Sequence, residues 1–529
     1  MNILIAEPMA AAGVELLKAQ AGWNVVVSNP KEYLNHLPEA DALVVRSAVK
    51  VTREVLEKAP KLRVIGRAGV GVDNVDLNAA TAAGVLVMNT PGGNAVSVAE
   101  HTIAFMLALA RSIPAASAST KSGKWEKKKF LGNEVRGKTL GVLGLGSIGR
   151  EVVKRARALE MRVLGADPYV SSQVAEDLDI ELVGLARLLA ESDYITLHTA
   201  LTPETKKVLS KEAFEQMKPG VRILNCARGE MIDQEALVDA IRSGKVAGAA
   251  LDVFSPEPLP PDHPLLALEN VIATPHIAGA TEEAQEIVGV RIAEQLAEYL
   301  RNGIAINAVN MPALTPEQYR SLGPYISLAE RLGSLAAQIA GANPKGVRFT
   351  YSGKIGDGKT HLVRNAGLVG LLNRWLSQRA TLVNAMQLAE QRSLAVEERH
   401  GPKAAHIDSV TLELETDAGI TTVEGAVLLG RPRLMQVDGI QCEAPLAGNL
   451  LFMKNQDVPG VIGHVGTVLG KNGVNIANFS LGRRELPLKE GEPLEALAVV
   501  ETDGAVSDDV IAQLKANPAV RVARAVSLA

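Results

Sequence analysis

The sequence has very little cysteine and no long apolar run. Its 529 residues contain two cysteines, Cys226 and Cys442, which are too few for a disulfide framework. No apolar stretch approaches the length that a membrane-spanning helix needs. The start, MNILIAEPMAAAGVELL, lacks the basic residues of a secretion signal and has the pattern of a buried strand followed by a helix. These absences predict a protein of the reducing cytoplasm without a membrane partner.

Neither sign of charge dominates the chain. Its 55 basic and 59 acidic residues leave a net charge of -4, which gives no general reason to expect nucleic acid or an anionic membrane as a partner. Low-complexity tracts and short tandem repeats are also missing. Apolar residues make up 47% of the chain, so folded domains are expected, and about 150 residues per domain predicts about three or four of them.

Short apolar runs alternate with helical patterns through the first half of the sequence. Such runs, separated by helices, indicate parallel sheets that are covered on both faces. They are too many for one sheet, so we expect two α/β domains, each a Rossmann-like, doubly wound parallel sheet. The first, a substrate domain, comprises residues 1–98 and 282–312, and the second, a nucleotide domain, comprises residues 99–281. A long helical segment at 281–303 would return the chain to the first domain and create a cleft.

The second half of the sequence has a different texture. A helical stretch of mixed polarity followed by alternating strands predicts an intervening α+β domain over residues 313–447. From residue 448 to 529 the order strand, helix, strand, strand, helix, strand predicts a small ferredoxin-like βαββαβ domain.

The segment TLGVLGLGSIGREVVKRARAL places Gly144, Gly146 and Gly149 in the spacing G-x-G-x-x-G. The spacing alone is a weak signal, but here it follows an apolar strand and opens an amphipathic helix, which is the context of a dinucleotide site. Gly144 permits the tight turn, Gly146 lets the backbone approach a pyrophosphate, and Gly149 lets the helix pack on the strand. The N–H groups at the start of the helix favour the phosphates.

The strand after this helix ends at Asp167, where a carboxylate can hold ribose hydroxyls. Its charge would repel a 2′-phosphate, and the following Pro168 and Tyr169 offer no cation to neutralise one. The sequence therefore favours NAD over NADP. A second glycine cluster, GRAGVGVDNVD, lacks a helix with a clear start, so it is either a backbone nest for a small anion or a plain turn.

Ligands of open parallel sheets bind beyond the carboxyl ends of the strands. In the nucleotide domain these ends carry polar or charged side chains, and one of them, Glu257, stands between two prolines in the rigid segment DVFSPEPLPPDHPLL. The six positions are Asp167, Thr199, Arg228, Asp252, Glu257 and His276.

These side chains suit the oxidation of a secondary alcohol. His276 titrates near neutrality and can take the hydroxyl proton, while Glu257 beside it would orient the ring and raise its pKa. Arg228 can clamp a substrate carboxylate through two parallel hydrogen bonds. Asp252 is expected to hold the nicotinamide amide. Each of these residues also has a purely structural alternative. His276 could be a core histidine, Arg228 could form a salt bridge at the end of the sheet, and Asp252 could cap a helix.

The motifs GLGSIGREV, NCARGEMIDQEAL, ALDVFSPEPL and TPHIAGATEEA resemble those of the D-isomer-specific 2-hydroxyacid dehydrogenases. The whole chain is similar to the long form of this family, which ends in an ACT domain. The resemblance implies Arg228, Glu257 and His276 as the catalytic set. It also implies NAD contacts at Gly144, Gly146, Ser147, Ile148, Gly149, Asp167, Thr199, Cys226, Ala227, Arg228, Asp252 and the turn from His276 to Gly279.

The resemblance also implies substrate contacts. They lie in VVRSAVKVT, GRAGVGVDN and NTPGGNAVSVAEH, at Arg46, Ser47, Gly69, Val70 and Asn94. The run GKWEKKKF has four lysines around Trp125, and related enzymes bring this loop across a subunit boundary to the substrate phosphate. A solvated basic loop is the alternative.

The ACT domain implies an amino-acid effector. In relatives L-serine inhibits at this domain, and Asn455, Asp457 and Asn475 match or replace the residues that contact it. Asp457 with Pro459 also has the pattern of a helix start. The intervening domain is expected to bind a second effector, which these residues do not identify.

The implied reaction is the NAD-dependent oxidation of D-3-phosphoglycerate to 3-phosphohydroxypyruvate, the first step of L-serine biosynthesis. The resemblance implies a homo-oligomer, a dimer or tetramer, and no metal. Two alternatives stay open: a glyoxylate or 2-ketoglutarate reductase, and an NAD-sensing binding protein that acts as a corepressor. The ACT-like end argues against the corepressor.

Overall fold

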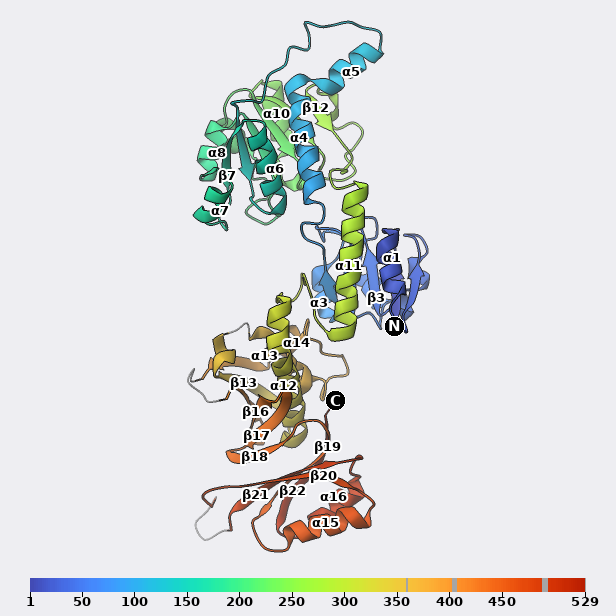
Figure 1. Ribbon diagram of the computed structural model, residues 1–529, viewed down its shortest axis with the longest axis vertical. Coiled ribbons are helices and arrows are strands. Elements are labelled where there is room, and N and C mark those ends of the chain that lie inside the picture. Colours follow the sequence, from blue (N-terminus) through green and yellow to red (C-terminus); the bar gives the residue numbers. More distant parts are fainter. Residues whose placement is uncertain (358–359, 402–406, 488–492, 529) are drawn as a thin grey trace.

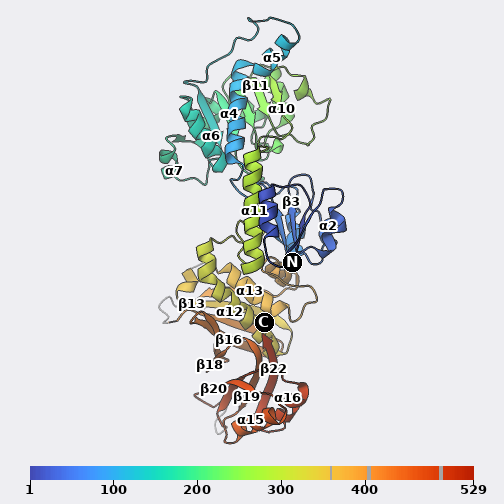
Figure 2. The same ribbon diagram turned by 45° about the vertical axis from the view of Figure 1, so that its right-hand side comes forward.

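The computed structural model describes residues 1–357, 360–401, 407–487 and 493–528. Four sheets follow one another along an elongated molecule, with the nucleotide domain at one end and the ACT domain at the other (Figure 1). Helix α11 (Glu282–Asn302) lies beside the substrate domain and runs towards the intervening domain in both views (Figure 2). The predicted fold class is confirmed.

The substrate domain is a five-stranded parallel sheet in the order β2-β1-β3-β4-β5. Its strands are almost wholly apolar because helices cover both faces. Helix α11 packs on α1, where a Cβ on Gly13 would lie 2.5 Å from the carbonyl oxygen of Gly289. The elements are β1 (Asn2–Ile5), α1 (Ala11–Lys18), β2 (Asn24–Val27), β3 (Ala42–Val45), α2 (Arg53–Glu57), β4 (Val64–Arg67), α3 (Leu77–Ala82) and β5 (Leu86–Met88).

The nucleotide domain is a seven-stranded parallel sheet in the order β12-β11-β10-β9-β6-β7-β8. Helices α4 and α6 bury one face, and α8, α9 and α10 bury the other. The helices are α4 (Ala95–Arg111), α5 (Ile113–Lys121), α6 (Ser147–Ala158), α7 (Ser172–Asp177), α8 (Leu185–Glu191), α9 (Lys211–Gln216) and α10 (Gln234–Arg242). The strands are β6 (Thr139–Leu143), β7 (Arg162–Ala166), β8 (Glu181–Leu182), β9 (Tyr194–Leu197), β10 (Val221–Asn225), β11 (Val246–Leu251) and β12 (Val271–Ala273).

The intervening domain has a six-stranded sheet in the order β14-β13-β15-β16-β17-β18, antiparallel except for the β13–β14 pair. Helix α12 starts with a capping box between Thr315 and Gln318. The elements are α12 (Pro316–Ala340), β13 (Pro344–Ser352), α13 (His361–Leu372), α14 (Ala385–Gln391), β14 (Ala395–His400), β15 (Ser409–Thr416), β16 (Gly419–Leu428), β17 (Arg431–Val437) and β18 (Ile440–Pro445).

The ACT domain has the predicted element order and an antiparallel sheet in the order β20-β21-β19-β22. The predicted helix start at Asp457 and Pro459 is wrong: the helix begins at Val461, after Gly460 at φ +95°. Gly460 suits this left-handed conformation, which a residue with a Cβ rarely adopts. The elements are β19 (Gly448–Gln456), α15 (Val461–Lys471), β20 (Ile476–Arg483), β21 (Glu495–Thr502), α16 (Asp508–Lys515) and β22 (Val520–Leu528).

One hydrophobic core joins three of the four domains. It runs from the substrate sheet through α11 and α12 to the face of the ACT sheet that includes Phe452 and Val499. The nucleotide domain has cores of its own. Among the described residues, no single helix combines the length and apolarity of a membrane span; α4 and α5, bent by 63°, meet these criteria only when taken together.

Candidate active site

His276 and Glu257 form a hydrogen-bonded pair at the ends of two neighbouring strands of the nucleotide domain. His276 follows β12, Glu257 follows β11, and the His276 Nδ1 atom lies 2.8 Å from Glu257 Oε2. The other Glu257 oxygen accepts a hydrogen bond of 2.9 Å from the backbone N–H of Phe254. About half of the His276 side chain is exposed, and no described residue bonds to its Nε2. The ring is thus held at one nitrogen and open at the other.

The pair shifts both pKa values in the direction that favours charge. The Glu257 hydrogen bond raises the pKa of His276 above its usual value, against the opposing effect of burial. Burial would raise the pKa of Glu257, but its hydrogen bonds to His276 and Phe254 outweigh this and lower it. The positive charge of Arg228 lowers the pKa of both groups. The third predicted catalytic residue therefore acts electrostatically on the other two.

Asp252 supports the turn that carries His276. Its carboxylate is fully buried and accepts hydrogen bonds of 2.8 Å from each of the backbone N–H groups of Ile277 and Ala278. Thr274 donates a third, of 2.5 Å. These bonds hold His276 at φ +55°, where a side chain with a Cβ is uncommon. The contact of Asp252 with the nicotinamide amide stays a prediction, and the structure shows that both of its oxygens also bond to the turn that carries His276.

Arg228 reaches from the nucleotide domain to the substrate domain. Its Nε and Nη2 atoms donate to Asp73 Oδ2 at 3.1 and 2.8 Å, and Nη1 donates to the carbonyl of Ala227 at 2.6 Å. Asp73 lies in the loop between β4 and α3. The side chain of Asn225 shapes the turn before Arg228, because it accepts from the N–H of Ala227 and donates to the carbonyl of Arg228.

The glycine-rich loop follows β6 and leads into α6, as the sequence predicts. Gly144 has φ +94°, and a Cβ there would lie 2.6 Å from the carbonyl oxygen of His198. A Cβ on Gly149 would lie 2.1 Å from the carbonyl oxygen of Gly144, whereas a Cβ on Gly146 would have no described atom within 4 Å outside its chain neighbours. Helix α6 starts at Ser147 without a side-chain cap, so its first N–H groups can meet a phosphate.

Asp167 holds this loop from the end of β7. Its Oδ2 atom accepts from the N–H of Leu145 at 2.8 Å, and its Oδ1 atom accepts from the N–H of Tyr169 at 2.9 Å. The side chain is half-buried, and both of its oxygens order the loop.

The remaining expected NAD residues lie along the same edge of the sheet. Ile148 is in the first turn of α6, and Thr199 follows β9. Cys226 and Ala227 form the turn after β10, where burial raises the pKa of the Cys226 thiol to about 12, as befits a structural thiol rather than a nucleophile. Gly279 lies against Asn94, since a Cβ on it would be 2.7 Å from Asn94 Nδ2.

The expected substrate residues lie on three loops of the substrate domain. Arg46 and Ser47 follow β3, and the N–H of Arg46 donates to Glu7 at 2.8 Å. Gly69 and Val70 follow β4, and Val70 accepts from the side chain of Asn89 at 2.5 Å. Asn94 precedes α4.

Sequence reasoning missed Arg67, the last residue of β4. Its buried Nε has no hydrogen-bond partner among the described residues. Burial and then the charge of Arg228 lower its pKa, with a further lowering effect from Arg46. A Cβ on Gly69 would lie 1.4 Å from Arg67 Nη1, so the guanidinium lies across this glycine. The signal was a charged residue at the end of a buried strand, in the motif IGRAG.

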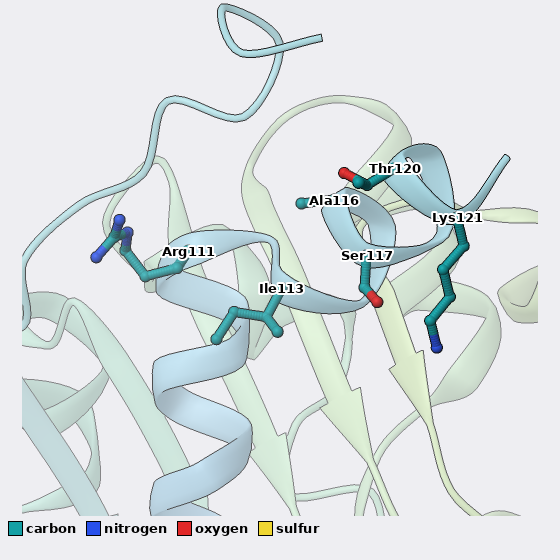
Figure 3. A pocket seen from close by; sticks show the side chains of 6 residues that line it. All are labelled: Arg111, Ile113, Ala116, Ser117, Thr120 and Lys121. Atoms are coloured by element: carbon teal, nitrogen blue, oxygen red, sulfur yellow. The ribbon is translucent and has the colours of Figure 1, made fainter. Parts of the chain in front are cut away.

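Within one chain, the lysine run GKWEKKKF does not reach the expected substrate residues. It follows α5, which projects from the outer end of the nucleotide domain (Figure 1). Helix α5, which the structure describes in full, buries none of its side chains, and Trp125 and Leu131 are 84% and 91% exposed. Figure 3 shows side chains around a shallow cavity of about 620 Å³ here: Arg111, Ile113, Ala116, Ser117, Thr120 and Lys121.

The three expected effector residues do not come together either. Asn455 and Asp457 line a cavity of about 310 Å³ between α15 and β20, where Asp457 forms an ion pair of 2.6 Å with Arg483. Asn475 precedes β20, at the opposite end of this strand, and donates to Asp503 at 2.7 Å. The cavity walls are mainly apolar. The described part of the chain holds no cluster of histidine, cysteine and acidic residues with the geometry of a metal site.

Three family models match the chain. They are the D-isomer specific 2-hydroxyacid dehydrogenase, NAD binding domain over residues 103–278, the D-3-phosphoglycerate dehydrogenase intervening domain over 321–438, and the ACT domain over 449–519. The D-3-phosphoglycerate dehydrogenase of Methanocaldococcus jannaschii is 42% identical over 100% of both chains. That of Archaeoglobus fulgidus is 44% identical over 91% of this chain and 92% of its own.

A solved structure is similar to more than half of the chain. The NAD-dependent formate dehydrogenase from Staphylococcus aureus in complex with NAD matches 58% of this chain and 99% of its own, with 30% identity and a TM-score of 0.53.

Proposed function

The chain belongs to the D-3-phosphoglycerate dehydrogenases, within the D-isomer specific 2-hydroxyacid dehydrogenases, and we propose that Arg228, Glu257 and His276 carry its reaction. It is an NAD-dependent dehydrogenase that oxidises D-3-phosphoglycerate to 3-phosphohydroxypyruvate, the first step of L-serine biosynthesis. The hydrogen-bonded pair of His276 and Glu257 is the observation that carries this assignment of roles.

The residues of the glycine-rich loop fit NAD, which accepts the hydride when bound. The open space beside Gly146 and the uncapped start of α6 suit the pyrophosphate, and Asp167 suits the ribose hydroxyls. The proposed NAD surface is completed by Ser147, Ile148, Thr199, Asp252, the turn at Cys226 and Ala227, and Gly279 at the turn that carries His276.

His276 acts on the substrate hydroxyl through Nε2. Glu257 holds Nδ1, so Nε2 is the nitrogen left to take the proton when the alcohol is oxidised. In the reverse direction the same nitrogen returns the proton to the carbonyl oxygen. Asp252 keeps the ring in place by fixing the backbone of the turn.

Cations of the substrate domain and Arg228 hold the two anionic ends of the substrate. Arg228 takes the carboxylate, because a guanidinium can donate two parallel hydrogen bonds to it. Arg46 and Arg67, whose Nε has no partner among the described residues, supply positive charge for the phosphate. Polar and backbone contacts come from Ser47, Gly69, Val70 and Asn94.

The reaction is tested by NAD reduction with D-3-phosphoglycerate and with a panel of 2-hydroxyacids that lack the phosphate. We expect kcat/KM to be highest for the phosphorylated acid. A preference for glycolate or 2-hydroxyglutarate would instead indicate a glyoxylate or 2-ketoglutarate reductase.

Regulation is proposed at the cavity of the ACT domain. Asp457 and Arg483 carry charges that match the ammonium and carboxylate of a free amino acid, and Asn455 adds a polar contact. L-serine is the proposed effector, with Asn475 contributing from a second copy because it lies at the far end of β20. Initial rates with L-serine, and with L-leucine and L-valine to match the apolar walls, test this.

A homo-oligomer in the cytoplasm is proposed as the working state. The exposed Trp125 and Leu131 beside the unburied α5 support packing against a second copy, which would also bring the lysine run to a neighbouring site. Light scattering gives the subunit number. We also propose the domain limits inferred from the sequence, 1–98 with 282–312, 99–281, 313–447 and 448–529.

A further inference from the structure

We propose that Asp73 is a positioning residue for the reaction: it fixes the guanidinium of Arg228 across the domain boundary so that the free edge of this group faces the substrate carboxylate. The inference rests on the proposed role of Arg228. It adds a residue that touches neither the substrate nor the reacting atoms and acts through Arg228.

The hydrogen bonds of Arg228 leave the right donors free. Asp73 Oδ2 accepts from Nε at 3.1 Å and from Nη2 at 2.8 Å, which occupies one side edge of the planar group. The carbonyl of Ala227 accepts from Nη1. Among the described residues each terminal nitrogen makes one such bond, so Nη1 and Nη2 each keep a second hydrogen. A carboxylate needs two parallel N–H donors of this kind.

The loop of the substrate domain is built to admit this contact. A Cβ on Gly71 would lie 2.1 Å from Arg228 Nη2 and 2.7 Å from Asp73 Oδ2. Any side chain at position 71 would therefore push the guanidinium or the carboxylate aside. Gly71 does not have a left-handed φ, so its backbone conformation does not require glycine. Glycine is required at this position because Arg228 approaches it closely.

The charge of Asp73 also suits its surroundings. Arg228 and Arg67 act on each other as like charges, and Asp73 opposes this repulsion, since it raises the pKa of Arg67. Burial would raise the pKa of Asp73, but the hydrogen bonds and charge of Arg228 outweigh this and lower it. Asp73 therefore stays ionised and keeps two arginines of different domains close together.

The test compares Asp73→Asn, Asp73→Ala and Asp73→Glu in the reduction of 3-phosphohydroxypyruvate. We expect Asp73→Asn and Asp73→Ala to lower kcat/KM by about 10- to 100-fold, mainly through a higher KM, because a carboxylate clamp displaced by about 1 Å loses this much. Asp73→Glu should recover part of the loss, and NADH affinity should stay unchanged. Gly71→Ala should reproduce the rise in KM with Asp73 intact.

A double-mutant cycle with Arg228→Ala shows whether Asp73 acts through Arg228. If it does, Asp73→Asn should change kcat/KM by less than about 2-fold once the guanidinium is gone. An equal loss in both backgrounds would overturn the inference. So would a lower KM in Asp73→Asn, because it would mean that Asp73 competes with the substrate for Arg228.

Two further results separate this inference from the proposed function. A wild-type KM in Arg228→Ala would remove the proposed role of Arg228 itself. A raised KM in Arg228→Ala together with an unchanged Asp73→Asn would remove only the role of Asp73. Asp179→Asn is the matched control, because Asp179 pairs with Arg157 on the exposed surface of the nucleotide domain, and its kinetics should equal those of the wild type.

Discussion

Two carboxylates set the state and the place of the His276 ring, and they do so through different atoms. Glu257 bonds to Nδ1 and so acts on the proton affinity of the ring. Asp252 bonds to the backbone N–H groups of the following two residues and so acts on the position of the ring. A neutral imidazole is needed to take a proton from the substrate, and a charged one is needed to return it. The pKa of His276 therefore decides the pH range of each direction.

Replacement of His276 by alanine should abolish most of the turnover and leave NAD binding intact. In the proposed mechanism the ring acts on the proton of the substrate rather than on the dinucleotide, and general acid–base catalysis contributes about 10²- to 10⁴-fold. Stopped-flow turnover and NAD titration by fluorescence measure the two quantities. Full turnover in His276→Ala would remove the assignment.

Replacement of Glu257 by glutamine should move the pH profile to lower pH. The hydrogen bond to the Glu257 carboxylate is the largest cause of the raised pKa of His276, and a neutral amide in its place weakens this bond and removes the negative charge. In the oxidative direction activity falls as the pH drops through the His276 pKa, so the acid limb of kcat/KM should shift towards acid. An unshifted limb would mean that another group titrates there.

At the scale of elements, the junction of β6 and α6 contains two glycines that are needed for different reasons. Gly149 lets the helix pack on the loop, because a Cβ would collide with the backbone of Gly144. A Cβ on Gly146 would meet no described atom outside its chain neighbours, so the fold does not require glycine there, and we expect its missing side chain to serve the ligand. The two positions can therefore be tested against each other.

Gly146→Ala should keep the thermal stability of the protein and weaken NAD binding by about 10-fold, which equals about 1.4 kcal/mol. Gly149→Ala should lower the stability by about 1–3 kcal/mol, as overpacking does. Thermal denaturation and NAD titration of both variants provide the comparison. Equal NAD affinity in Gly146→Ala and the wild type would place the pyrophosphate elsewhere.

At the scale of the whole molecule, the cores divide the chain unequally. Substrate domain, intervening domain and one face of the ACT sheet share one core, and Thr381 and Gln378 of the intervening domain also donate to the carbonyls of Gly84 and Ala82. The nucleotide domain has separate cores. It meets the substrate domain at polar contacts such as that between Ser97 and Thr281.

We therefore expect two transitions in calorimetry, one for the nucleotide domain and one for the rest of the chain. NAD at 100 times its Kd should stabilise the first by about 2.7 kcal/mol, because a ligand stabilises the part that binds it. The second transition should stay in place. A single transition that moves as a whole would mean that the domain boundary is as cohesive as the shared core.

Features that depend on neighbouring residues could be predicted from the order of the amino acids. Apolar runs bounded by turns gave the parallel strands, and the spacing of Gly144, Gly146 and Gly149 gave the loop after β6, because both patterns follow from local geometry. The shared edge of the strands was enough to bring His276 and Glu257 to one place, since parallel strands end on the same side.

Contacts between distant segments could not be predicted in this way, because they depend on the packing of the folded chain. Asp73 and Arg228 are 155 residues apart, and no local pattern marks them as partners. The packing of whole elements likewise decides the burial of Asp252 and the separation of Asn475 from Asp457. It also leaves the Nε of Arg67 without a partner in the described part of the chain. A sequence pattern reports the face that a residue takes in its own helix or strand, whereas these contacts depend on which elements meet.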